Sequence, residues 1–172
     1  DLVDFIIVSD GVFSNTKSII ENKSIKPRYN GSVAIRTVIK SSEEFNYESK
    51  NISLIMFPNA HVVIYPINKK NDFNLVCIAR EKLSQNYDIN SIIKKKVLSK
   101  NKNLENLFKG DLNLWPVYVT KKPIKSIHDN VFYLGDAFYT FVPALAQGAS
   151  QSIEAAYELF NLLNENKKNI QN

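Results

Sequence analysis

The chain has 172 residues, of which 44% are hydrophobic and 23% are charged, a composition typical of a soluble globular protein. No apolar run reaches the ~18 residues of a membrane span, and no apolar leader with a cleavage site is present, so we expect a cytoplasmic location. One cysteine and two histidines exclude an internal disulfide and predict no metal site. The net charge of +5 comes largely from lysine tracts without interleaved aromatic residues. This pattern argues against nucleic-acid binding, whereas peripheral contact with a membrane stays open.

The first predicted element is a strand from Leu2 to Val8, which is apolar except for Asp4. Such a run is typical of a parallel strand that is buried on both faces. Asp10-Gly11 ends the strand, and a short helix is predicted to follow and to end near Glu21. Taken alone, Asp-Gly is also one of the commonest turn dipeptides.

The middle of the chain predicts a mostly antiparallel sheet, because short apolar or alternating runs are separated by turn residues. The expected strands are Ser32–Lys40, Ile52–Phe57, His61–Ile67 and Phe73–Ala79, with a polar hairpin loop between the last two. Cys77 lies in an apolar run and is expected to be buried and inert.

Two short helices are predicted after this sheet. The first is capped by Asp88 and carries Ile92, Ile93 and Val97 on one face. The second runs from Leu104 to Lys109 and stops at Gly110. An aromatic strand with Trp115 follows, between Asp111 and Val119.

The most informative stretch begins with Val131 to Leu134, an apolar run that predicts an interior strand. Gly135-Asp136 follows at once, at the end of a strand where α/β sheets bind ligands. After a loop, a helix is expected to begin near Gly148, and the polar tail after Asn164 is expected to fray. The buried face of this helix is predicted to contain Ile153, Ala156, Tyr157, Phe160 and Leu163. The plainer interpretation is a strand, a turn and a helix with an exposed aspartate.

Two motifs carry a resemblance to a known family. Leu134-Gly135-Asp136-Ala137, Pro143 and Ala146-Gln147-Gly148-Ala149 resemble the second flavin-binding motif of the FAD-dependent aromatic hydroxylases of the para-hydroxybenzoate and salicylate hydroxylase type. Asp10-Gly11, with Ser14 after it, resembles the Asp-Gly motif of the same family, although Lys17 stands where arginine is usual.

The resemblance implies an α/β (α+β) fold. Residues 1–29 and 111–172 would form a partial FAD/NAD(P)-binding Rossmann-like domain, and residues 30–110 an inserted, mostly antiparallel substrate-binding sheet with helices. The chain contains no Gly-x-Gly-x-x-Gly, the fingerprint of the first βαβ unit. We therefore expect it to be the C-terminal part of a longer protein or a truncated reading frame.

The implied activity is that of a monooxygenase. NADPH or NADH reduces FAD, and a flavin hydroperoxide then inserts one oxygen atom into a small aromatic substrate. The residues expected to bind the cofactor are Asp10, Gly11, Gly135, Asp136, Pro143, Ala146, Gln147, Gly148 and Ala149. The residues expected to line the substrate pocket are Tyr65, Trp115, Tyr139 and Phe141. Tyr65 is equally well explained as a core or interface residue, and Trp115 as a packing residue. The sequence predicts neither catalytic side chains nor an oligomeric state.

Two other interpretations stay open. Relatives of geranylgeranyl reductase share the Asp-Gly and Gly-Asp motifs, so a flavin-dependent reductase or dehydrogenase is one alternative. A non-catalytic fragment that binds no flavin is the other, because the Gly-rich unit is not found. The bulky Phe138, Tyr139 and Phe141, and Val142 where a proline is frequent, depart from the family pattern.

Overall fold

The computed structural model describes residues 3–40, 51–67, 72–143 and 146–170. The chain forms two compact units. The first unit comprises Asp1–Asn30 and Tyr118–Asn172, and the second comprises Gly31–Val117. The binding roles that the sequence assigned to its two predicted domains, divided at residues 30 and 110, stay predictions.

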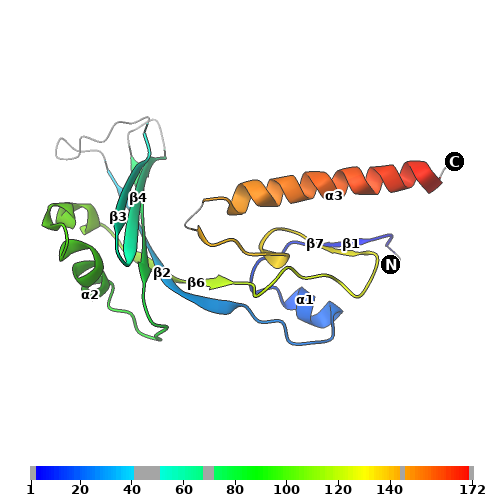
Figure 1. Ribbon diagram of the computed structural model, residues 1–172, viewed down its shortest axis with the longest axis horizontal. Helices are drawn as coiled ribbons and strands as arrows, with labels where there is room; N and C mark the ends of the chain where they lie inside the picture. The colour runs from blue at the N-terminus through cyan, green and yellow to red at the C-terminus, as the bar shows by residue number, and fades with distance from the viewer. Residues whose placement is uncertain (1–2, 41–50, 68–71, 144–145, 171–172) are drawn as a thin grey trace. The chain divides into compact units, whose positions relative to one another are not determined.

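The sheet of the second unit has five strands in the order β3-β4-β5-β2-β6 (Figure 1). Neighbouring strands pair antiparallel in β3 with β4, β4 with β5, and β2 with β5. The mostly antiparallel sheet predicted from the sequence is therefore confirmed. The strands are β2 (Arg28–Ile39), β3 (Ser53–Phe57), β4 (Ala60–Pro66), β5 (Phe73–Arg80) and β6 (Asn113–Val119).

Helical segments cover one face of this sheet. Helix α2 (Ile89–Ile93) continues into a π-helical turn, Lys94–Leu98, and a 3-10 helix, Lys102–Phe108, follows. The Asp88 carboxylate accepts a hydrogen bond from the Ser91 amide at 3.0 Å, which confirms the predicted cap. Cys77 is completely buried in the core, and this burial raises the pKa of its thiol to about 12. The predicted burial of Cys77 is therefore confirmed, and its thiol is uncharged at neutral pH.

A buried hydroxyl of this sheet has no hydrogen-bond partner among the described residues. The hydroxyl belongs to Thr37, which is buried on β2. Gly110 lies against it, because a Cβ added to Gly110 would stand 2.8 Å from the Thr37 hydroxyl oxygen.

Replacing Thr37 with valine is expected to stabilise the protein. Valine keeps the branched shape and removes a buried hydroxyl without a partner, a change worth about 1 kcal/mol in the free energy of unfolding. Denaturant unfolding of Thr37→Val and Thr37→Ser measures the effect. Serine keeps the hydroxyl and loses a methyl group, so it is expected to destabilise. Loss of stability in the valine variant would show that the hydroxyl is satisfied in solution.

The first unit is built on a two-stranded parallel sheet, in which β1 (Ile6–Val8) pairs with β7 (Val131–Tyr133). Helix α1 (Asn15–Ile20) follows β1, and a 3-10 turn (Gly135–Ala137) follows β7. Helix α3 (Gly148–Ile170) is the last described element (Figure 1). It begins where the sequence predicted, but it continues through the segment that was expected to fray.

Two predictions of burial in this unit are wrong. In β1, Ile6 and Ile7 are 40% and 45% exposed, because among the described residues the strand has only β7 beside it. On α3, Ile153, Tyr157 and Phe160 are each at least 60% exposed, and Ala156 is exposed as well. The helix instead buries Leu159. Both elements thus leave part of their apolar surface uncovered within the described chain.

A buried carboxylate joins the end of α1 to β7. Glu21 is only 4% exposed and accepts hydrogen bonds from the Tyr133 hydroxyl at 2.7 Å and the Ser126 hydroxyl at 2.8 Å. The Ile127 amide donates a third, at 3.3 Å. Burial raises the pKa of Glu21, but these three donors outweigh it and hold the pKa below its ordinary value. The network fixes the helix that carries Lys17 against the strand that leads to Asp136.

Candidate functional site

The register of the parallel sheet brings the two predicted motifs to one edge. Val8 pairs with Tyr133, and the Leu134 amide donates a hydrogen bond to the Val8 carbonyl at 2.9 Å. Asp10 and Asp136 therefore follow the carboxyl ends of neighbouring parallel strands. In open α/β sheets this edge is where ligands bind.

Lys17 connects the two motifs electrostatically. Its side chain is 1% exposed, and its Nζ donates a hydrogen bond to the Val12 carbonyl at 3.3 Å. Burial lowers the pKa of Lys17, while the charges of Asp10 and Asp136 raise it in part. Both carboxylates thus act on a single buried ammonium group.

The two carboxylates have different environments. Partial burial raises the pKa of Asp10, but hydrogen bonds with Ser14 and Thr16 outweigh it, so the net shift is downward. The Thr16 hydroxyl lies 2.8 Å from the carboxylate. Asp136 is exposed, but the partial desolvation of its carboxylate raises the pKa, and the charge of Lys17 offsets part of this rise. Among the described residues, the hydrogen bond found at Asp136 goes to its backbone carbonyl and none goes to its carboxylate, so the carboxylate oxygens are available to accept from ligand hydroxyls.

Glycines allow close approach at this edge. Gly135 has a φ of +56°, and a Cβ there would lie 3.2 Å from the Ser152 hydroxyl in the first turns of α3. The position therefore favours glycine both by conformation and by contact. At Gly148, the first residue of α3, a Cβ would meet no atom within 4 Å.

The start of α3 offers unpaired donors. The first amides of a helix have no acceptor within the helix and carry the positive end of its dipole. The neighbouring Pro143, Gln147 and Ala149 are all exposed. This segment is therefore suited to contact an electron-rich group, and the binding roles predicted for Pro143, Gln147, Gly148 and Ala149 stay predictions.

Ala146 has a left-handed backbone conformation, with a φ of +51°. Its sequence position is one where glycine is frequent in the similar family. A left-handed conformation costs an ordinary L-residue roughly 1–2 kcal/mol. Alanine is thus strained at the loop that precedes α3.

Replacing Ala146 with glycine is expected to raise the free energy of unfolding by about 0.5–1 kcal/mol, because relief of strain exceeds the entropy cost of glycine. Thermal unfolding of Ala146→Gly measures this. Ala149→Gly is the matched control, since Ala149 lies in helical backbone and its replacement is expected to destabilise. Equal destabilisation by both variants would show that the backbone at Ala146 is not strained.

Aromatic side chains line a cavity of about 260 Å³ beside the 3-10 turn. Phe138, Tyr139 and Phe141 contribute to it together with Gly135 and Ser152. The Tyr139 and Phe141 rings meet edge to face, with centroids 5.2 Å apart. Two of the predicted substrate-pocket residues are therefore in contact.

The other two predicted pocket residues belong to the second unit. The Tyr65 hydroxyl accepts a hydrogen bond from the Asn74 side-chain amide at 2.6 Å. Trp115 is 51% exposed, and the Arg36 guanidinium lies 5.8 Å from its ring centroid. A single pocket that includes Tyr65, Trp115, Tyr139 and Phe141 stays a prediction.

Sequence reasoning left two residues out of the predicted site. Lys17 was noted only as a replacement for arginine, and Glu21 only as the end of a helix. The signal for Lys17 was its spacing from Asp10, which places it on the first turn of the helix after the motif. No sequence signal identifies Glu21, because its partners lie more than a hundred residues away.

The described part of the chain contains no group of three or more His, Cys, Asp or Glu residues that could hold a metal ion. A search of the described helices found none with the length and apolar character needed to cross a membrane.

No family model and no curated protein sequence matches the chain. Solved structures do. HpxO of Klebsiella pneumoniae, in complex with FAD and uric acid, has a TM-score of 0.75 and 16% identity over 88% of this chain. A salicylate hydroxylase substrate complex has a TM-score of 0.72 and 18% identity over 90%. PqsL, a probable FAD-dependent monooxygenase from Pseudomonas aeruginosa, has a TM-score of 0.67 and 18% identity over 94%.

The chain spans less than half the length of these proteins, covering 40%, 44% and 46% of them respectively. At these identities the likeness is one of fold. It confirms the fold predicted from the two motifs and the antiparallel insertion. The chain therefore has the fold of one part of the FAD-dependent monooxygenases.

Proposed function

We propose that this chain is part of an FAD-dependent monooxygenase that inserts one oxygen atom into a small aromatic substrate. One observation carries the proposal. The β1–β7 register sets Asp10 and Asp136 at the same sheet edge, and both act on the buried Lys17. Asp136 is exposed, as the plainer interpretation of a strand, a turn and a helix expects, but that interpretation does not account for this convergence.

The residues at the sheet edge fit the chemical groups of FAD. Asp136 has oxygens available to accept hydrogen bonds from the hydroxyls of a ribityl or ribose group. The amides at the start of α3 are suited to the electron-rich edge of the flavin ring, and Gly148 leaves space for its approach. When bound, FAD would supply electron transfer and oxygen activation, with NADPH or NADH as the reductant.

The remaining cofactor-binding residues have supporting roles in this proposal. Gly11 and Gly135 both have positive φ and allow the tight turns that follow the strands. Asp10 is held by Thr16 and orders the turn beside Lys17. Pro143, Ala146, Gln147 and Ala149 shape the loop and the first turn that face the flavin.

The aromatic side chains would shield the reaction from water. Phe138, Tyr139 and Phe141 form apolar walls immediately after Asp136. Excluding water protects reactive species from unproductive decay. Tyr65 and Trp115 of the antiparallel sheet are proposed to complete the substrate pocket in the whole protein.

Isotopically labelled dioxygen tests the reaction class. The complete gene product is incubated with NADPH or NADH and a panel of small phenols and aromatic acids, and products are analysed by mass spectrometry. A monooxygenase is expected to place one labelled oxygen atom in the product. A product reduced at a double bond without label would favour the reductase alternative, and flavin binding without turnover of any compound would not support the proposal.

A further inference from the structure

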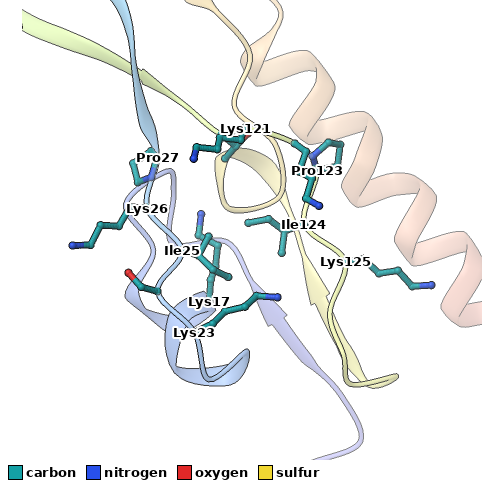
Figure 2. Close-up of a pocket in the computed structure, with 12 residues that line it drawn as sticks. Lys17, Lys23, Ile25, Lys26, Pro27, Lys121, Pro123, Ile124 and Lys125 are labelled. Atoms are coloured by element: carbon teal, nitrogen blue, oxygen red, sulfur yellow. The ribbon is translucent and has the colours of Figure 1, made fainter.

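A cavity of about 600 Å³ lies in the first unit and shares only Pro123 with the lining of the aromatic cavity (Figure 2). Two chain segments form most of it, residues 23–27 after α1 and residues 120–125 after β6. Lys17 of α1 contributes from within, and Figure 2 shows it beside Ile25 and Lys23. The volume is in the range of small-molecule sites in proteins.

The charge of this cavity is of one sign. Six lysines line it, and no lining residue is acidic: Lys17, Lys23, Lys26, Lys121, Lys122 and Lys125. Within the described chain, the one recorded salt bridge joins Lys96 to Glu81, so none of these six amines is paired in that way. A concave surface with charge of one sign concentrates the field and attracts oppositely charged ligands.

Nearby carboxylates do not cancel this charge. Glu21 is close enough to interact with Lys23, but it is already held by three donors from Tyr133, Ser126 and Ile127. Asp10 and Asp136 raise the pKa of Lys17 without reaching salt-bridge distance. An anion that enters the cavity would therefore meet several unpaired ammonium groups.

The cavity also has apolar walls. Ile25 and Pro27 come from one segment, and Pro123 and Ile124 from the other. A purely inorganic anion would leave these walls without a partner, whereas a ligand with an apolar body would bury them. The combination suits a molecule that has a flat apolar group and more than one negative charge.

We propose that the lysine cavity, defined by residues 17, 23–27 and 120–125, binds an organic phosphate of the nucleoside diphosphate class. The phosphates contact the lysines, which act as compact charged donors. The base lies between the isoleucine and proline walls. The cavity shares Lys17 with the Asp136 edge and Pro123 with the aromatic cavity, whereas its other five lysines belong to neither site. The inference rests on those five lysines and does not require the proposed monooxygenase activity.

Calorimetric titration of the purified protein with ADP tests this proposal. ADP is expected to bind, its affinity is expected to fall as salt rises, and adenosine is expected not to bind. The variant Lys121→Gln/Lys122→Gln removes two exposed lysines of the cavity and is expected to weaken ADP binding about tenfold or more. Lys94→Gln/Lys100→Gln removes the same charge from exposed positions of the second unit and is expected to change the affinity less than about twofold.

Other outcomes would overturn the proposal. Equal loss of affinity in both double variants would show a general effect of net charge. Binding of adenosine and ADP with equal affinity would show that the lysines are not used. Binding to anionic phospholipid vesicles without binding to ADP would make the lysines a membrane-contact surface.

Discussion

Replacing Asp136 with alanine is expected to weaken FAD binding by the complete gene product about 10- to 100-fold, the loss of one or two hydrogen bonds to a charged acceptor. The expectation follows from its place after β7 and from its carboxylate oxygens, which no described residue occupies. Fluorescence titration with FAD measures the affinity.

Asp129→Ala is the matched control, because Asp129 is an exposed aspartate of the same unit in the turn before β7. It is expected to bind FAD as the unaltered protein does. Equal affinity in the Asp136 and Asp129 variants would remove Asp136 from the proposed site. Far-UV circular dichroism of both variants separates lost binding from lost folding.

Replacing Glu21 with glutamine is expected to lower the free energy of unfolding by about 2–4 kcal/mol. One amide oxygen replaces two carboxylate oxygens, so the Tyr133 hydroxyl, the Ser126 hydroxyl and the Ile127 amide cannot all keep their acceptor. The charge that strengthens these bonds is lost as well. Denaturant unfolding measures the effect.

The same residue is expected to contribute to the loss of stability in acid. The pKa of Glu21 is lower in the folded protein than its ordinary value of 4.5. The unfolded chain therefore takes up the proton first as pH falls. The contribution of Glu21 is present above pH of about 4.5 and is lost as pH falls through the folded pKa, and Glu21→Gln is expected to lack this part of the pH dependence.

Two further variants make the result specific. Tyr133→Phe removes the 2.7 Å hydrogen bond alone and is expected to lower stability by about 1–2 kcal/mol. Glu158→Gln, at an exposed position of α3, is expected to change it by less than about 0.5 kcal/mol. Similar stability of the Glu21 and Glu158 variants would show that the hydrogen bonds to Glu21 do not stabilise the fold.

The sequence predicted elements well where the cause is local. Short apolar or alternating runs between turn residues predicted the strands of the antiparallel sheet, and Asp88 predicted the start of α2. These signals depend only on side-chain periodicity and on caps. The Gly135-Asp136 motif likewise predicted the end of β7, because the positive φ at that position favours glycine.

The burial of apolar side chains on α3 and β1 could not be predicted from the sequence. The spacing of Ile153, Tyr157 and Phe160 identifies an apolar face, but periodicity does not say what covers it. Both isoleucines of β1 are exposed for the same reason, since the described chain supplies one neighbouring strand. Which surface packs against an apolar face depends on the tertiary fold, so local sequence patterns do not predict it.

The lysines show the same limit in the candidate site. A basic residue at position 17 is expected at the surface, yet it is among the most deeply buried side chains of the chain. In the sequence, Lys121 and Lys122 form another short lysine tract of the kind expected at the surface. Only the fold places them around the same cavity as Lys17 and Lys23.

The most direct test of the central claim is an absorbance spectrum of the purified protein, recorded with this chain alone and with the complete gene product after addition of FAD. We predict flavin bands that persist through gel filtration in the complete gene product and that are weaker or lost in this chain. No retained flavin in either protein would contradict the account and would leave the motifs as parts of a scaffold.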